Sequence, residues 1–122
     1  MYGRIGCMGI FLPTPVPTQD AASIVDRKLS WILSACRPEE VWLFGSAATG
    51  GMTEASDIDL ALLFNHDTEI REAQSKLAAT PRLDNWPQDI VWFRFEEFYK
   101  RAAIGGLPMI IIQEGKRLHP HP

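Results

Sequence analysis

The sequence has little that would support a disulfide framework or a zinc site. It contains two cysteines, Cys7 and Cys36, and three histidines, and their spacing matches no pattern of metal ligands. Both cysteines are therefore interpreted as reduced thiols of a reducing compartment.

The sequence also lacks a long apolar run and a surplus of positive charge. No stretch approaches the roughly 18 consecutive apolar residues of a membrane helix, and no apolar signal segment precedes "RIGC" at residues 4–7. The formal net charge is −3, so no broad basic field is available to bind a nucleic-acid backbone. We expect a cytoplasmic protein that neither enters a membrane nor binds extended nucleic acid.

The composition that is present is typical of one folded domain. Hydrophobic residues make up 46% of the 122 residues, which is enough to bury a core, and the chain is too short for two independent domains. Residues 1–19 are rich in Gly and Pro and are interpreted as an irregular N-terminal arm. We expect the domain itself at residues 20–119 and a short tail at residues 120–122.

Hydrophobic periodicity within the domain predicts helices that alternate with strands. Asp20 is interpreted as the N-cap of the first helix, and Asp67 as the cap of the helix that continues to about Ala79. The segments predicted to be helical are 21–36, 67–79, 96–103 and a short stretch after Pro108, and the predicted strands are 41–45, 57–64 and 89–95. This order predicts an α/β or α+β domain built on a small mixed sheet flanked by helices.

The segment "GSAATGGMTEASDID" at residues 45–59 contains the residues best suited to chemistry. Alternate residues of a strand share a face, so Asp57 and Asp59 point the same way and repel each other unless one is protonated or a cation bridges them. Carboxylate oxygens suit Mg²⁺, which takes further ligands from substrate phosphates. Gly45 and Ser46 follow a strand, where backbone amides and a hydroxyl can bind phosphate oxygens.

The pairing of "GS" with "DID" resembles the signature of the nucleotidyltransferase superfamily related to polymerase β. The flanking strands "VWLFGS" and "SDIDLALLF" are similar to those of the family, and "EGKRLH" resembles the ending of minimal nucleotidyltransferases (MNT). The resemblance extends from about residue 21 to residue 119. It implies the polymerase β-like nucleotidyltransferase fold.

The resemblance implies a third carboxylate on a neighbouring strand. Asp89 in "QDIVWF" matches that position, and Asp84 in "RLDNWP" is the alternative. Together with Asp57 and Asp59, Asp89 would hold two Mg²⁺ ions, and Asp89 is also the candidate proton acceptor. In the reaction so implied, AMP is transferred from ATP to a hydroxyl while Gly45 and Ser46 hold the outgoing phosphates.

The sequence departs from the family where basic side chains commonly follow Gly-Ser, because Ala47 and Thr49 stand there. Each lost contact between a charged group and phosphate is worth about 1.5 to 3 kcal/mol. Basic residues that could compensate are Arg71, Lys76, Arg82 and Arg94. Trp86 lies in a loop and is the candidate for stacking on a base.

Three hypotheses about function remain open, beside a structural role for the Asp pair alone. The resemblance implies an MNT antitoxin that adenylylates a tyrosine of a HEPN-domain toxin partner, as part of a homo- or hetero-oligomer. The first alternative is a free-standing enzyme that modifies a small hydroxyl-bearing molecule. The second is a catalytically silent antitoxin that acts by contact, and Ala47 and Thr49 favour it.

Overall fold

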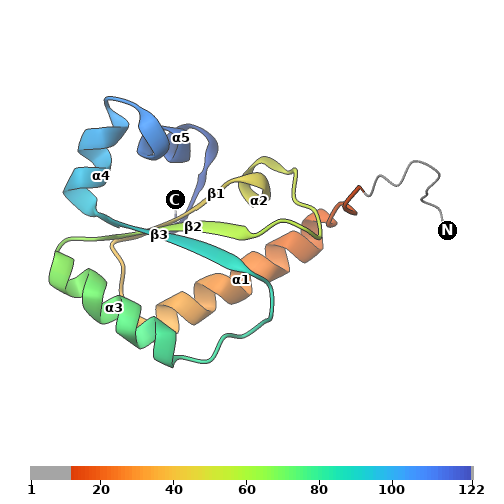
Figure 1. Ribbon diagram of the computed structural model, residues 1–122, viewed down its shortest axis with the longest axis horizontal. Coiled ribbons are helices and arrows are strands. Elements are labelled where there is room, and N and C mark those ends of the chain that lie inside the picture. The colour runs from red at the N-terminus through yellow and green to blue at the C-terminus, as the bar shows by residue number, and fades with distance from the viewer. Residues whose placement is uncertain (1–11, 122) are drawn as a thin grey trace.

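In the computed structural model, which describes residues 12–121, helices cover both faces of one mixed four-stranded sheet (Figure 1). Most of the predicted N-terminal arm, residues 1–11, lies outside the described residues, as does Pro122. The helices are α1 (Thr18–Ala35), α2 (Ser46–Thr49), α3 (Asp67–Ala79), α4 (Phe95–Ala102) and α5 (Gly106–Glu114). The strands are β1 (Glu40–Phe44), β2 (Ile58–Phe64), β3 (Gln88–Arg94) and β4 (Lys116–His119). The predicted fold class is confirmed.

The sheet has the strand order β3-β2-β1-β4. β1 runs antiparallel to both β2 and β4, whereas β2 and β3 are parallel. Parallel neighbours need a crossover connection, and α3 provides it between β2 and β3. As a result β2 and β3 begin at the same end of the sheet, and the residues that open them lie side by side.

Side chains of β2 are buried on both faces of the sheet, which explains the continuous apolar run in this strand. Leu60 and Leu62 belong to the core shared with α1 and α3, whereas Ala61 and Leu63 belong to the core shared with α4 and α5. Figure 1 shows these helix pairs on opposite sides of the sheet. By the same alternation Asp59 belongs to the face that carries α4 and α5.

The predicted helices and strands are confirmed, and their bounds differ by a few residues at most. The first helix begins at Thr18, so the prediction that Asp20 caps it is wrong: the amide of Asp20 donates to the carbonyl of Pro17 within the first turn. The last helix begins at Gly106, before Pro108, because proline is tolerated in the first turn of a helix. α2 and β4 have no counterpart among the predicted elements.

Two further expectations concern the cysteines and the membrane. Cys36 carries a free, buried thiol whose burial raises its pKa, and Cys7 lies outside the described residues. Among the helices within residues 12–121, none is both long enough and apolar enough to cross a membrane.

Candidate active site

The three predicted aspartates lie together where β2 and β3 begin. Asp57 immediately precedes β2, Asp59 is its second residue, and Asp89 is the second residue of β3. The parallel register pairs Asp59 directly with Asp89. Residues paired in this way share a face of the sheet, and Asp57 shares it by alternation. The structure therefore brings all three carboxylates to one end of one face.

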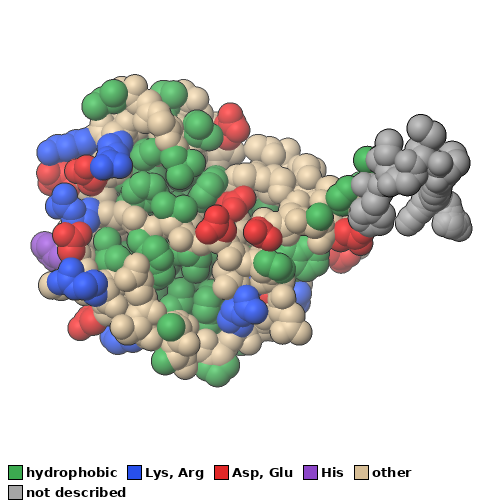
Figure 2. All heavy atoms as spheres, in the orientation of Figure 1, with side chains coloured by type: hydrophobic (Ala, Val, Ile, Leu, Met, Phe, Trp, Pro, Cys, Tyr) green, Lys and Arg blue, Asp and Glu red, His purple; other side chains and the backbone are tan. Residues whose placement is uncertain are grey.

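The charges of these side chains act on one another. Burial, followed by the negative charges of Asp89 and then Asp57, raises the pKa of Asp59 above the usual aspartate value. Asp59 is half-buried, whereas Asp57 and Asp89 are exposed. A cation placed among the three groups would offset this repulsion. Figure 2 shows acidic side chains gathered on this face, beside hydrophobic side chains that cover the neighbouring part of the molecule.

Gly45 packs its backbone directly against the Asp59 carboxylate. Its φ of 73° and ψ of −158° lie in a region that is almost restricted to glycine. A Cβ at this position would overlap the Asp59 Oδ2 atom, so glycine is required both by the backbone conformation and by the close approach. The antiparallel register of Phe44 with Asp59 creates this contact.

The residues after Gly45 form the single turn of α2. Ser46 opens the turn, and the Thr49 hydroxyl donates to the Gly45 carbonyl oxygen at 3.4 Å. Ala47 packs against the hydrophobic core, so an apolar contact occupies the position at which the family resemblance led us to expect a basic residue. The Gly-Ser pair thus lies beside the three carboxylates without a basic side chain from α2.

The residues present fit a divalent cation in their chemistry. Three carboxylates on one face supply the hard oxygen ligands that Mg²⁺ prefers. Over the described range, no three Asp, Glu, His or Cys side chains converge closely enough to enclose an ion. A site at Asp57, Asp59 and Asp89 would therefore require these side chains to rotate toward one another, and their ligand roles stay a prediction.

Asp84, the alternative third carboxylate, has a different partner. Its Oδ1 atom lies 2.6 Å from the ammonium of Lys28, a residue of α1 that is completely buried. The same oxygen accepts a hydrogen bond from the Trp86 amide at 2.7 Å, which is the local turn contact typical of aspartate. Lys28 was not among the predicted site residues, because lysine on a helix is usually exposed.

Trp86 was predicted to stack on a base, but its ring is engaged within the fold. The indole nitrogen donates to the carbonyl oxygen of Ser56 at 2.8 Å, and the half-buried ring packs against the core. These contacts account for the tryptophan without a ligand. They also connect the loop before β3 to the segment that leads into β2.

The four basic candidates lie in different places. Arg82 donates to the Gln88 side chain at 2.8 Å, next to Asp89. Arg94 ends β3 at the opposite end from the carboxylates, where it pairs with exposed Asp67 and Glu97 at 3.6 Å. Because Gln88 alternates with Asp89 along β3, the bond from Arg82 lies on the α1 side of the sheet, whereas the three aspartates lie on the other side.

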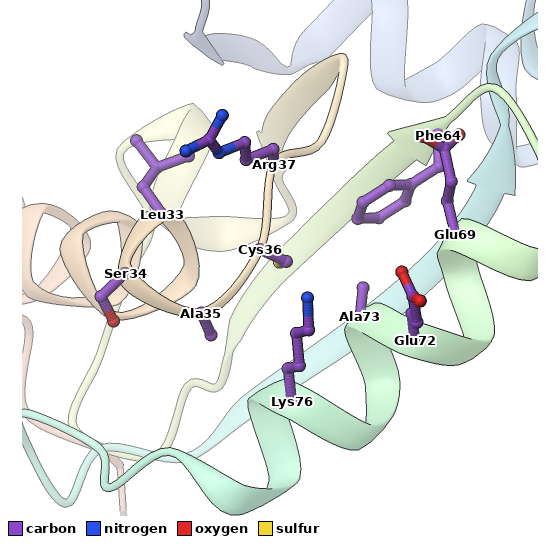
Figure 3. A pocket seen from close by; sticks show the side chains of 10 residues that line it. All are labelled: Leu33, Ser34, Ala35, Cys36, Arg37, Phe64, Glu69, Glu72, Ala73 and Lys76. Carbon is purple, nitrogen blue, oxygen red and sulfur yellow. The ribbon is translucent and has the colours of Figure 1, made fainter.

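Lys76 lines a pocket of about 330 Å³ between the C-terminal part of α1 and α3 (Figure 3). Phe64, the last residue of β2, also lines it, so the pocket lies at the other end of the strand from the three aspartates. Arg71 is an exposed residue of the same helix, α3. Neither residue is placed to compensate for the basic groups missing from α2.

A second cavity adjoins the carboxylate face. Its volume is about 430 Å³, and its walls include Val91 and Phe93 of β3 together with Ile104 and Leu107. Val91 and Phe93 alternate with Asp89 along the strand and so share its face. Ile104 is 88% exposed. An apolar surface therefore continues from the candidate site along β3.

Comparison with known proteins identifies a family for most of the chain. A family model described as a nucleotidyltransferase domain matches residues 24–118. A solved crystal structure from Sulfolobus solfataricus, described as a candidate nucleotidyltransferase, is 21% identical. The match covers 76% of this chain and 84% of that chain, with a TM-score of 0.46. No curated protein matches the sequence.

Proposed function

Because the chain belongs to the nucleotidyltransferase domain family, we propose that it transfers AMP from ATP to a hydroxyl in a Mg²⁺-dependent reaction. The observation that carries this proposal is the register of Asp59 with Asp89, with Asp57 on the same face. A carboxylate triad of this kind suits the two-metal arrangement used for displacement at phosphorus. Asp57 and Asp59 would hold both ions, and Asp89 would hold one of them.

In the proposed step the acceptor oxygen attacks the α-phosphorus of ATP. A bond forms between that oxygen and phosphorus, the bond to the bridging oxygen breaks, and pyrophosphate leaves with the electron pair. The hydroxyl proton passes to a carboxylate, for which Asp89 is the candidate because it is exposed at the edge strand. Bound Mg²⁺ supplies positive charge that neutralises the triphosphate.

Gly45 and Ser46 are proposed to hold the departing phosphates. Gly45 is suitable because its lack of a Cβ keeps the Asp59 carboxylate and the backbone in contact. Ser46 adds a hydroxyl at the start of α2, beside the carboxylates.

The acceptor is proposed to be a tyrosine of a HEPN-domain toxin, which would make the protein an antitoxin. The apolar cavity lined by Val91 and Phe93 supports a protein acceptor, since it offers hydrophobic contact beside the carboxylates. A silent antitoxin that binds by contact is the second candidate, and the apolar packing of Ala47 favours it. A small hydroxyl-bearing molecule is the remaining alternative acceptor.

The test compares ATP labelled at the α-phosphate with ATP labelled at the γ-phosphate, in the presence of Mg²⁺ and a HEPN-domain protein encoded beside this chain. We expect the α-label, and not the γ-label, on the HEPN protein, with no label from Asp57→Asn. Tight binding without either label would favour the contact mechanism and contradict transfer. Label appearing only on added small alcohols would overturn the protein acceptor.

A further inference from the structure

Lys28 is a buried lysine whose contacts all lie in the segment that leads into β3. Its ammonium donates to Asp84 Oδ1 at 2.6 Å, to Gln88 Oε1 at 2.7 Å and to the carbonyl oxygen of Trp86. The side chain is fully buried although α1 is otherwise amphipathic. The last of its partners, Gln88, immediately precedes Asp89 in the sequence.

The same segment is also bonded to the chain that carries the other two aspartates. The Ile58 amide donates to the Pro87 carbonyl oxygen at 3.0 Å, and the Trp86 indole donates to the Ser56 carbonyl oxygen at 2.8 Å. Ser56 and Ile58 flank Asp57. Contacts from one short segment therefore reach α1, the start of β2 and the start of β3.

Packing alone does not account for a lysine at this position. An ammonium has three donor hydrogens, and here three acceptors meet it. A methionine of similar length would fill the space without the cost of burying a charge, and such replacements of buried ion pairs are often neutral or stabilising. The ammonium adds directional hydrogen bonds, which fix the three acceptor atoms around its nitrogen.

We propose that Lys28 is a positioning residue for nucleotidyl transfer. It holds residues 84–88 in place and so keeps Asp89 in register with Asp59. The expected effect of Lys28 on the reaction rests on the proposed function. The expected effect of Lys28 on the conformation of residues 84–88 does not. Lys28 lies on the α1 side of the sheet and the aspartates on the other side, so it acts through the backbone of β3. Its contribution is to geometry and not to the chemistry itself.

The first test measures kinetics on the double variant Lys28→Met, Asp84→Asn, which removes both charges of the buried pair together. We expect a cooperatively folded protein with kcat reduced about 10- to 100-fold, as found for residues that orient ligands. The Mg²⁺ concentration for half-maximal rate should rise, while KM for ATP changes little. Lys100→Met is the matched control, because Lys100 is exposed on α4. Values of kcat and Mg²⁺ requirement equal to those of the control would overturn the proposal.

A second measurement does not depend on activity. Hydrogen exchange of the Ile58 amide reports the bond to Pro87, and we expect exchange at least about tenfold faster in the double variant. The Leu62 amide, deep in the sheet, should be unchanged. Gln88→Ala, which removes one acceptor and keeps the ion pair, serves if the double variant does not fold. Wild-type exchange at Ile58 would overturn the proposal, whereas absence of transfer by the wild-type protein would refute only the proposed function.

Discussion

At the residue scale, the contact between Gly45 and the Asp59 carboxylate sets the geometry of the candidate site. We predict that Gly45→Ala lowers kcat/KM about 100-fold or more, since a displacement of reacting groups by about 1 Å has effects of this size. The backbone conformation should also cost about 1 to 3 kcal/mol in free energy of unfolding. Steady-state kinetics and urea denaturation measure the two effects.

Gly50 provides the control for that substitution. It also has a positive φ, of 88°, but a Cβ there would have nothing within 4 Å. Gly50→Ala should therefore lose stability through strain and keep its activity per folded molecule. Equal loss of activity in both variants would show that strain, and not displacement of Asp59, is the cause.

The raised pKa of Asp59 gives a second prediction at this scale. In metal-free protein, the Asp59 carboxyl should titrate above the usual aspartate range, because burial and the charges of Asp89 and Asp57 disfavour its ionised form. Cation binding needs the ionised form, so the affinity of the metal-free protein for Mg²⁺ should rise as pH increases through this pKa. Asp57→Asn should shift the titration downward, as measured by carbon-13 NMR of the carboxyl groups. Titration of Asp59 together with exposed aspartates in both proteins would contradict the account.

The residues of the candidate site could be read from the sequence to different degrees. Asp57 and Asp59 follow from strand alternation, whereas Asp89 was proposed because it matches the third carboxylate that the family resemblance implies. Lys28 could not be found in this way, since its partners lie 56 to 60 positions further along the chain. Its burial depends on tertiary contacts that leave no local pattern.

At the element scale, long segments were predictable and short ones were not. The predicted end of α3 at Ala79 is confirmed, but the cap is His66, and Asp67 is the first residue of the helix. The His66 amide donates to the Glu69 carboxylate, which completes a capping box. α2 is a single turn and shows no periodicity. β4 contains two basic residues and forms because it pairs with β1, a contact distant in the sequence.

A tyrosine that connects α4 to β1 gives a prediction that can be tested by titration. The Tyr99 hydroxyl donates to buried Glu40 at 2.6 Å, and burial together with this bond and the negative charge of Glu40 raises the pKa of Tyr99 to about 12. Since the folded-state pKa is raised, the stabilisation is present below pH 10 and is lost as pH rises toward 12. We predict phenolate absorbance near pH 12 in a Tyr2→Phe variant, which leaves Tyr99 as the remaining tyrosine.

Glu40→Gln is the comparison for this titration. It removes the negative charge and should move the ionisation of Tyr99 to lower pH, although burial remains. Far-UV circular dichroism at each pH shows whether the protein is still folded. Ionisation of Tyr99 near pH 10 in a Tyr2→Phe variant that keeps Glu40 and is still folded would contradict the described contact.

At the scale of the whole molecule, the alternation of helices and strands predicted the α+β class but not the strand order. Pairing of β2 with β3 in parallel, and of β1 with β4, depends on contacts between distant segments. This pairing is what unites Asp59 with Asp89. Three carboxylates repel a polyphosphate unless cations reverse the local charge, so the proposed function depends on a metal site at this end of the sheet.

The measurement that tests this claim most directly is the binding of Mn²⁺, as a spectroscopic substitute for Mg²⁺, in the presence of a non-transferable ATP analogue. Electron paramagnetic resonance follows the loss of the free-ion signal in wild-type protein, Asp57→Asn, Asp59→Asn and Asp89→Asn. Asp26→Asn, at an exposed position of α1, is the control. The account predicts binding by the wild-type and control proteins and at least about tenfold weaker binding by the other three, a difference of about 1.4 kcal/mol. Equal binding by all five proteins would contradict it.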